Sequence, residues 1–578
     1  MDRDWVHLAL REQIFSRADS DLFLFEEDDR EGLGIEKGLW LGVSVPDGAA
    51  RREGLLRLVP TQERRPFECS ISATPQSVEL AAGDGQLTIV MDSADAMRIY
   101  GTGLGIMIHK EMPVMSLETI TEVRPGIADY NLFVPTGGGG HLVFSSISGS
   151  LTVDRQTKLT AGGVNQCTIW IEPGKDGHWE ALVTCSAPMP EMPKPRSMSE
   201  AKEAAAQAFE RFTETVFLSP KRSADSAFLL RCAYALWIAR RKGKANENSI
   251  MRLPMFCRSR MTDSQCSSRQ QPVFALAIRK QETSESALTS VFPFLRNGML
   301  PEAICTTKLR YAHFPLLHAY VLSRVLNAGT APDKERAADL YGVFRQVLEQ
   351  VMETHSFSAG RLSSLNQGEL SIPASAPAGA CFPLETPELY TRMIFWAEMI
   401  GRLERLAEKG SGVSWYTLSR SWLAILTEEL WDGAAFCCRE TATGRLLQDD
   451  SLLARYPLLL GLRLPETILS TLAEELFSPR FLGDHGLASL ATDNGGFREE
   501  AQGRGAVDLM TNGLYVLALR DARRHTQADK LAELLLRDAQ EQGPAPLCAF
   551  YSGEREPVRP GDGWDAASAA MLIAIAEQ

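Results

Sequence analysis

The chain has 578 residues, more than a single hydrophobic core usually supports, so we expect at least two domains. With 44% hydrophobic and 23% charged residues, its composition is that of an ordinary globular protein. The formal net charge of −13 argues against nucleic acid as a partner, because the sequence contains no basic stripe that could neutralise phosphates.

Signals for export, for a membrane span and for zinc are missing from the sequence. Residues 1–5 do not open a basic region followed by an apolar run, and no stretch of about 18 apolar residues could span a membrane. The eleven cysteines form no Cys-x-x-Cys pair of the kind that binds zinc or carries redox chemistry. We therefore expect a cytoplasmic protein with reduced, mostly buried thiols and no membrane partner.

Residues 1–186 carry the pattern of a β-sandwich domain. Short apolar runs alternate with turns rich in Gly, Pro and Asp, and about ten such strands at this spacing are typical of a sandwich. The glycine run at residues 137–140 precedes strand-like residues 142–144 rather than a helix, so it predicts a hairpin loop and not a phosphate cradle. The clearest strand runs are residues 39–45, 55–59, 87–91, 168–172 and 179–185.

A proline-rich linker at residues 187–198 ends this domain, and a helical domain is predicted over residues 199–578. Ser199 has the residue type of a helix N-cap, with acidic residues in the turn that follows. From there the apolar period is 3.6 residues. It predicts helices near residues 199–217, 222–242, 270–281, 284–296, 308–328, 333–354, 386–408, 413–430, 451–460, 465–477, 504–523, 526–541 and 564–577.

These helices alternate between two kinds. Residues 229–238 are apolar on most faces and predict an inner helix, whereas residues 333–352 carry charge on one face and predict an outer helix. Tight loops such as residues 297–301, Asn-Gly-Met-Leu-Pro, separate them because neither Gly nor Pro continues a helix. The alternation predicts a closed ring of helical hairpins, an (α/α)6 barrel, whose loops build a central pocket at one end.

Several short segments of the helical region occur in the same order in a known group of enzymes. They resemble the six-hairpin glycosidases of the trehalase, processing α-glucosidase and amylo-1,6-glucosidase type. The resemblance covers nearly the whole chain in layout, and it implies a β-sandwich, an (α/α)6 barrel and action on a small α-glucoside or oligosaccharide. The segments that carry it are residues 297–301, 314–319, 430–436, 485–491, 504–505 and 563–567.

Four positions that carry function in this family differ here. Residues 267–271, Ser-Ser-Arg-Gln-Gln, stand where the family has a Trp-Asp pair that grips a sugar hydroxyl. The loop at residues 360–369 lacks the aspartate expected as general acid, and Ala549 replaces the glutamate expected as general base. Residues 506–508, Ala-Val-Asp, replace the family's Pro-Val-Trp.

Inverting glycoside hydrolysis needs two carboxyl groups roughly 6.5–9.5 Å apart, one protonated and one ionised. Glu369 is the only carboxylate in the acid loop, so it is the candidate acid, and Glu554 or Asp508 is the candidate base. Each has a structural alternative. Glu369 fits a solvated loop, Glu554 an exposed turn with Arg555 and Glu556, and Asp508 a helix N-terminus in the same turn as Arg504.

The resemblance further implies a small carbohydrate as the ligand, with the candidate substrate-binding residues Arg504, Trp564, Tyr551 and Phe382. No cofactor or metal is expected, because P-loop and dinucleotide signatures are missing from the sequence, and no Gly-x-Ser-x-Gly elbow indicates a serine nucleophile. His313 and His318 also lack the spacing that puts two metal ligands on one helical face.

Three functions therefore stay open. The chain is an inverting glycoside hydrolase, or a catalytically inactive homologue that binds carbohydrate or has a structural role, or another enzyme such as a lyase. A lyase would need a basic side chain in the pocket, for which Tyr551 is the candidate.

Overall fold

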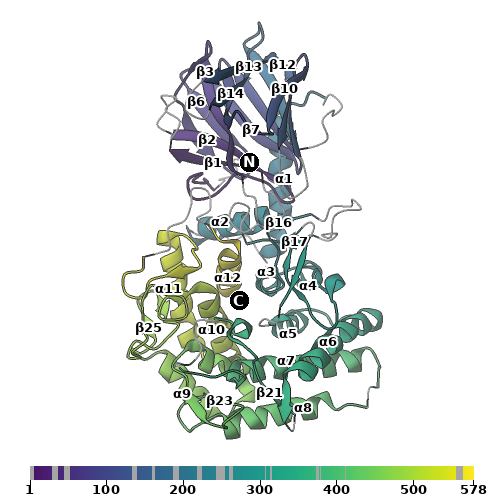
Figure 1. The fold of residues 1–578 in the computed structure, drawn as a ribbon, viewed down its shortest axis with the longest axis vertical. Coiled ribbons are helices and arrows are strands. Elements are labelled where there is room, and N and C mark those ends of the chain that lie inside the picture. The colour runs from purple at the N-terminus through teal and green to yellow at the C-terminus, as the bar shows by residue number, and fades with distance from the viewer. Residues whose placement is uncertain are drawn as a thin grey trace. The chain divides into compact units, whose positions relative to one another are not determined.

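The computed structural model divides the chain into two compact units (Figure 1). The first comprises Met1–Gln265, Cys305–Lys308 and Val558–Ala566, and the second comprises Cys266–Ile304, Leu309–Pro557 and Ala567–Gln578. The structure describes residues 6–28, 37–43, 52–132, 140–158, 163–185, 194–217, 224–242, 254–258, 265–305, 308–312, 316–358, 360–372, 377, 379–410, 412–554 and 564–577. Most of the glycine run and of the proline-rich stretch lies outside these residues.

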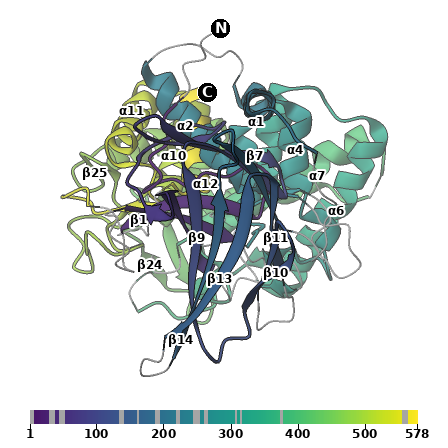
Figure 2. The same cartoon turned by 90° about the horizontal axis from the view of Figure 1, so that it is seen from above.

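Two antiparallel sheets form most of the first unit (Figure 2). One has the strand order β1-β2-β3-β9-β14-β13, with β4 paired to β3, and the other has the order β10-β11-β12-β15-β8-β7-β6-β5. The strands of the first sheet are β1 (Leu22–Asp28), β2 (Lys37–Val43), β3 (Arg52–Gln62), β4 (Arg65–Pro66), β9 (Gly105–Pro113), β13 (Ser150–Lys158) and β14 (Val164–Glu172). Those of the second are β5 (Ser70–Ala73), β6 (Val78–Ala82), β7 (Gly85–Ser93), β8 (Ala96–Thr102), β10 (Thr119–Arg124), β11 (Ile127–Leu132), β12 (Gly140–Ser148) and β15 (His178–Cys185).

The alternating sequence of β14 explains its place in the sheet. Ile169 and Ile171 are fully buried on one face of the strand, while Trp170 packs on the opposite face against Val59 and Met107. The sheets contact each other where β13 meets β10, β11 and β12, and where β14 meets β15. The predicted β-rich N-terminal region is therefore confirmed.

Two helices, α1 (Met198–Val216) and α2 (Ala224–Ala239), belong to the first unit. Helix α1 packs on β7, and Arg196 just before it donates to Asp92 at 2.7 Å. Ser197, not Ser199, is the N-cap, in a capping box with Glu200. The domain division at residues 187–198 stays a prediction, since the compact units divide the chain elsewhere. The first unit also holds the short strands β16 (Arg240–Arg241) and β17 (Met255–Phe256).

The second unit is mainly helical, and α7 and α10 are buried on nearly all faces whereas α6 and α11 bury one face. Its helices are α3 (Gln271–Ala277), α4 (Gln281–Thr289), η1 (Phe292–Phe294), α5 (His318–Ala328), α6 (Lys334–His355), η2 (Gln367–Glu369), α7 (Pro387–Leu406), α8 (Trp415–Ala424), the π-helical η4 (Ile425–Glu429), η5 (Leu452–Arg463), α9 (Glu466–Leu476), α10 (Leu509–Asp521), α11 (His525–Gln542) and α12 (Ala566–Glu577). Short strands join them: β18 (Pro301–Ile304), β19 (Leu309–Tyr311), β20 (Ser356–Ser358), β21 (Arg361–Leu362), β22 (Leu384–Glu385), β23 (Cys437–Glu440), β24 (Leu446–Gln448), β25 (Leu482–Gly483), β26 (Gly486–Leu487), β27 (Val507–Asp508) and β28 (Leu547–Cys548).

The helix contacts follow the predicted alternation. The elements α3, α5, α7, η5 and α10 contact one another in that order. A second set flanks them: α4 contacts α3 and α5, α6 and α8 contact α7, α9 contacts η5, and α11 contacts α10. The second region of the chain is thus helical, as predicted, and its helices form an inner and an outer row.

The predicted helix over residues 308–328 is wrong in its first part. Residues Leu309–Tyr311 form β19, which pairs with β18 as a hairpin, and α5 begins only at His318. An apolar run this short is compatible with either structure, so periodicity alone does not separate them. No helix in the described part of the chain is both long enough and apolar enough to cross a membrane.

Candidate functional site

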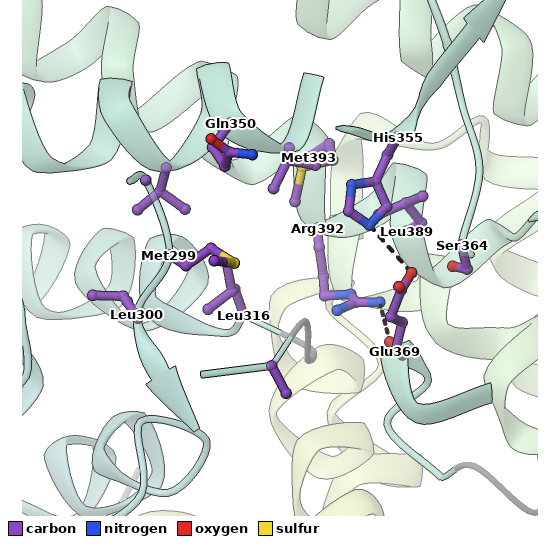
Figure 3. A pocket seen from close by; sticks show the side chains of 14 residues that line it. Met299, Leu300, Leu316, Gln350, His355, Ser364, Glu369, Leu389, Arg392 and Met393 are labelled. Atoms are coloured by element: carbon purple, nitrogen blue, oxygen red, sulfur yellow. Dashed lines mark hydrogen bonds and ion pairs between the residues drawn. The ribbon is translucent and has the colours of Figure 1, made fainter. Parts of the chain in front are cut away.

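A cavity opens in the second unit between α6, α7 and three loop segments (Figure 3). The empty space between its walls, with the open solvent at the mouth included, is about 540 Å³. Apolar side chains form most of the wall, and five polar ones are grouped with them. The lining residues are Gly298, Met299, Leu300, Ala312, Leu316, Val347, Gln350, Val351, His355, Ser364, Glu369, Leu389, Arg392 and Met393.

Helical spacing brings the wall residues together. Val347, Val351 and His355 lie four residues apart on one face of α6, which Asp333 caps by accepting from the Arg336 amide. Helix α7 begins at Pro387 behind the N-cap Thr386 and presents Leu389, Arg392 and Met393 in the same way. The cavity is therefore built on two capped helices and not on loops alone.

Glu369, at the end of η2, contributes the carboxylate of the cavity and is only 5% exposed. Its Oε2 accepts from the Leu365 amide at 2.7 Å and lies 3.2 Å from His355 Nε2, while its Oε1 accepts from Asn366 Nδ2 at 3.0 Å. The solvated-loop alternative for Glu369 is thus wrong. The carboxylate is buried and held by neighbouring donors.

Arg392 of α7 holds the end of the same loop. Its Nη2 donates to the backbone oxygen of Glu369 at 3.3 Å and lies 3.6 Å from Glu388 Oε1. Glu388 is 1% exposed and also accepts from the amide of Ser371 at 3.1 Å. The positive charge of Arg392 is therefore balanced inside the protein, and its position is fixed from two sides.

A second ion pair fastens both ends of the segment that carries Glu369. Glu385, which has no exposed surface, accepts from Arg361 Nη1 at 3.0 Å and from Arg439 Nε at 2.6 Å. Both arginines also pair with Glu429. Between these ends, Ser364 and Leu384 exchange two backbone hydrogen bonds, of 2.7 and 2.9 Å. The loop of the cavity is thus closed at its base.

Asp508 does not line this cavity. It is the N-cap of α10, where its Oδ1 accepts from the Thr511 amide at 2.7 Å. The helix N-terminus alternative is confirmed, but Arg504 lies in a turn before β27 and not on the helix that Asp508 caps. In the part of the chain that the structure describes, no carboxylate forms an ion pair with the half-buried Arg504.

Glu554 and Tyr551 lie in one tight turn. The Ala549 amide donates to the Glu554 backbone oxygen at 2.7 Å, and the Glu554 side chain is exposed. Tyr551 is 65% exposed, and its ring packs edge-on against Phe550 with centroids 4.9 Å apart. Its amide donates to Glu499 Oε2 at 3.1 Å. Arg555 and Glu556 lie outside the described residues.

The two remaining predicted aromatics pack against other side chains, and neither lines the cavity. Phe382 packs on a buried cluster of Leu370, Ile372 and Leu453. Trp564 belongs to the first unit, is 7% exposed, and lies under the guanidinium of Arg231, whose Cζ is 4.3 Å from the ring centroid. The structure therefore brings Glu369, of all the predicted site residues, into the cavity.

A comparison with known protein families finds a match over the stretch that contains all the residues lining the cavity. Residues 295–555 match the family model described as "Mannosylglycerate hydrolase MGH1-like glycoside hydrolase domain". This stretch is a domain of the six-hairpin glycosidase superfamily. A search of curated protein sequences found no match to the chain.

Solved structures give matches of low sequence identity. One is the GH63 mannosylglycerate hydrolase from Thermus thermophilus in complex with glucose, at 15% identity and a TM-score of 0.45, covering 54% of this chain and 93% of that one. The same hydrolase with Tris and D-glycerate matches at 16% identity and a TM-score of 0.44, with the same coverage. A sialidase matches at 9% identity and a TM-score of 0.43, covering 96% of this chain and 60% of that chain.

In this glycosidase-like domain, sequence reasoning missed His355 and Arg392. His355 ends α6 one residue beyond the predicted helix, and Arg392 is a charge within a strongly apolar helix pattern, which could have marked it. His318, fully buried at the start of α5, is packed against Phe292, and burial lowers the pKa of its ring to about 3. His313 lies outside the described residues.

Proposed function

We propose that the cavity around Glu369 binds a small carbohydrate, and that the domain does not hydrolyse it by the predicted inverting route. One observation carries the proposal: among the described residues, Glu369 is the one carboxylate that lines the cavity. Inverting hydrolysis requires a second carboxylate across the bond to activate water. The proposal thus favours the second of the predicted functions, a glycosidase homologue that binds a sugar.

The positions and contacts of the other carboxylates support this proposal. Asp508 caps a helix, and the Glu554 side chain is exposed on a tight turn. Glu388, the buried carboxylate nearest in the loop network, is occupied by Arg392 and Ser371. Using Asp508 or Glu388 as a base would first require breaking the contacts that hold it, and Glu554 does not line the cavity.

The wall of the cavity fits a sugar ring in its chemistry. Gln350 and Ser364 offer hydrogen-bonding groups for hydroxyls, and Met299, Leu316 and Met393 offer apolar surface for the C–H face of a ring. The matching family model carries the name of a mannosylglycerate hydrolase, so glucosides and mannosides of small size are the ligands to test first.

We further infer that the two helix rows close into an (α/α)6 barrel. The contacts from α3 through α5, α7 and η5 to α10 follow the order that the inner ring of such a barrel requires. The match of residues 295–555 to a glycoside hydrolase domain supports the same architecture.

A second candidate function is hydrolysis with Glu369 as the acid. The contact of Glu369 Oε2 with His355 Nε2, 3.2 Å long, favours it because a histidine next to a buried carboxyl can supply a proton. In this case the base would come from outside the described lining residues.

The two candidates are separated by measuring binding and turnover on the same variants. Binding of glucose, mannose, maltose and aryl glycosides is followed by the melting temperature, and turnover by release of the aryl group. Glu369→Gln is compared with the matched control Glu349→Gln, which changes an exposed glutamate of α6. We expect sugars to raise the melting temperature of the wild type and of the control but not of Glu369→Gln, without turnover. Turnover that Glu369→Gln abolishes would establish the second candidate, and a melting temperature that no sugar raises would refute binding.

A further inference from the structure

The polar and the apolar side chains of the cavity are gathered at different ends of it. Figure 3 shows Met299, Leu300 and Leu316 at one end and Ser364 and Glu369 at the other. A hydroxyl that is buried without a hydrogen-bond partner costs free energy, whereas an alkyl group gains from leaving water. A ligand that fills both ends should therefore have a polar part and an apolar part.

The loop that carries Met299 is held against α6 by a two-residue turn. Arg296 and Met299 exchange two backbone hydrogen bonds, of 3.0 and 2.9 Å, across this turn. Its residues Asn297 and Gly298 have φ angles of 49° and 70°, and a tight hairpin turn of this kind requires positive φ at both. A Cβ atom on Gly298 would lie 2.3 Å from the Cβ of Gln350, so the turn touches the helix directly. The apolar end of the cavity is thus built on a well-defined part of the wall.

Two side chains at this end keep apolar surface that a ligand can cover. Met299 and Leu316 are half-buried and line the cavity, whereas Leu300 and Met393 are each only 2% exposed. Removing apolar surface from water is favourable in proportion to its area. The surface of Met299 and Leu316 therefore favours an apolar group on the ligand.

The apolar end offers few hydrogen-bonding groups for hydroxyls. Gln350 is the labelled polar side chain that lies near Met299 in Figure 3. Arg392, which lies between the two ends, already donates to the backbone oxygens of Glu369 at 3.3 Å and of Glu388 at 3.4 Å. A second sugar, with a hydroxyl on most of its carbons, would need more partners than one amide supplies. This end suits a short alkyl group better than a second sugar.

We propose that the end of the cavity formed by Met299, Leu300 and Leu316 is a subsite for an apolar aglycone, an alkyl group of a few carbons. The ligand is then a glycoside whose sugar lies at the Glu369 end. The inference rests on the proposed function for the sugar, while the apolar subsite has a test of its own.

The first test measures binding of methyl, ethyl, propyl and butyl α-D-glucosides and α-D-mannosides to the full-length protein by titration calorimetry. We expect the affinity to rise about fourfold with each added methylene group until the subsite is full. The matched ligand is the glyceryl glycoside, which has the carbon chain of the propyl glycoside and two more hydroxyls. It should bind about tenfold more weakly than the propyl glycoside. Affinities that stay level along the series, or equal affinities for this pair, would overturn the proposal and leave the sugar site in place.

A polar substitution in the wall tests where the subsite lies. Met299→Gln keeps the length of the side chain and adds an amide, so the gain per methylene group should fall below about twofold. The control Met115→Gln makes the same change at a methionine that is 88% exposed in the first unit, and the gain should stay that of the wild type. A full gain in Met299→Gln would refute the subsite.

Butan-1-ol separates a failure of this inference from a failure of the proposed function, because it is the aglycone without the sugar. Its binding is followed by saturation-transfer NMR on the wild type and on Met299→Gln. Binding of butanol that Met299→Gln weakens, together with no binding of any glycoside, would refute the sugar site and uphold the subsite. Binding of the methyl glycosides without binding of butanol, and without a gain along the series, would refute the subsite alone.

Discussion

Arg361 Nη1 lies 3.0 Å from Oε1 of the fully buried Glu385, and the pair joins the two ends of the segment that carries Glu369. Removing one partner of a buried pair leaves the other charge in a low-dielectric environment, which costs far more than losing an exposed pair. We therefore expect the substitution of either partner, although both lie outside the cavity, to disturb the loop that carries Glu369.

We predict that Arg361→Ala lowers the free energy of unfolding by about 3 kcal/mol, because Glu385 loses one of its two arginine partners. Amide hydrogen exchange should also become faster in residues 362–370, since the loop loses the tie at its base. Urea unfolding and exchange mass spectrometry measure the two effects. The control Arg345→Ala removes an exposed pair with Glu349 and should cost about 0.5 kcal/mol or less. Equal losses in both variants would contradict the prediction.

The second prediction concerns Glu369 itself. Glu369→Gln replaces one acceptor oxygen of a buried side chain with an amide nitrogen that cannot accept, so either the Leu365 amide or Asn366 Nδ2 loses its partner. We expect a loss of about 1–3 kcal/mol in urea unfolding. Unchanged stability would show that the contacts of the carboxylate are not maintained in solution.

Sequence patterns predicted the coarse fold well where segments are long. Helices α6 and α7 were found because apolar residues recur over many turns, and the β-rich region because its strands alternate. The hairpin of β18 and β19 was missed because its strands have four and three residues, too short for any period to decide. The order of the short motifs along the chain still indicated the superfamily, even though these short strands were missed.

The residues of the site were harder to predict from the sequence than the fold was. Glu369 was proposed because it is the one carboxylate in a loop where the family places an acid. His355 and Arg392 lie 14 and 23 residues from Glu369 in the sequence. They contact Glu369 because of the way the segment between α6 and α7 folds. A single sequence carries periodicity but no record of which distant residues meet, so their contacts with Glu369 could not be derived.

The third prediction uses the buried ring of His318. Burial lowers its pKa from 6.5 to about 3, so the unfolded chain binds a proton at this residue below pH 6.5 while the folded protein does not. The contribution of His318 to stability is therefore full above pH 6.5 and is lost as the pH falls, by about 1.4 kcal/mol per pH unit. Replacing it with Leu should flatten the dependence of unfolding free energy on pH between 6.5 and about 4.

The control for His318→Leu is His525→Gln, which changes an exposed histidine at the start of α11. Its pH dependence should be that of the wild type. At neutral pH, His318→Leu should cost little, because no described residue forms a hydrogen bond with either ring nitrogen. A slope that persists unchanged in His318→Leu would assign the acid sensitivity to other groups.

The fourth prediction separates the structural from the catalytic role of Asp508. As the N-cap of α10 it accepts from the Thr511 amide, so Asp508→Ala should lower the free energy of unfolding by about 1 kcal/mol. Asp508→Asn keeps a capping oxygen and should cost a few tenths of a kcal/mol. If capping is its whole role, both variants bind sugars as the wild type does. A base, in contrast, would lose its function in Asp508→Asn despite the retained cap, so stable protein with lost turnover in that variant would return Asp508 to the catalytic site.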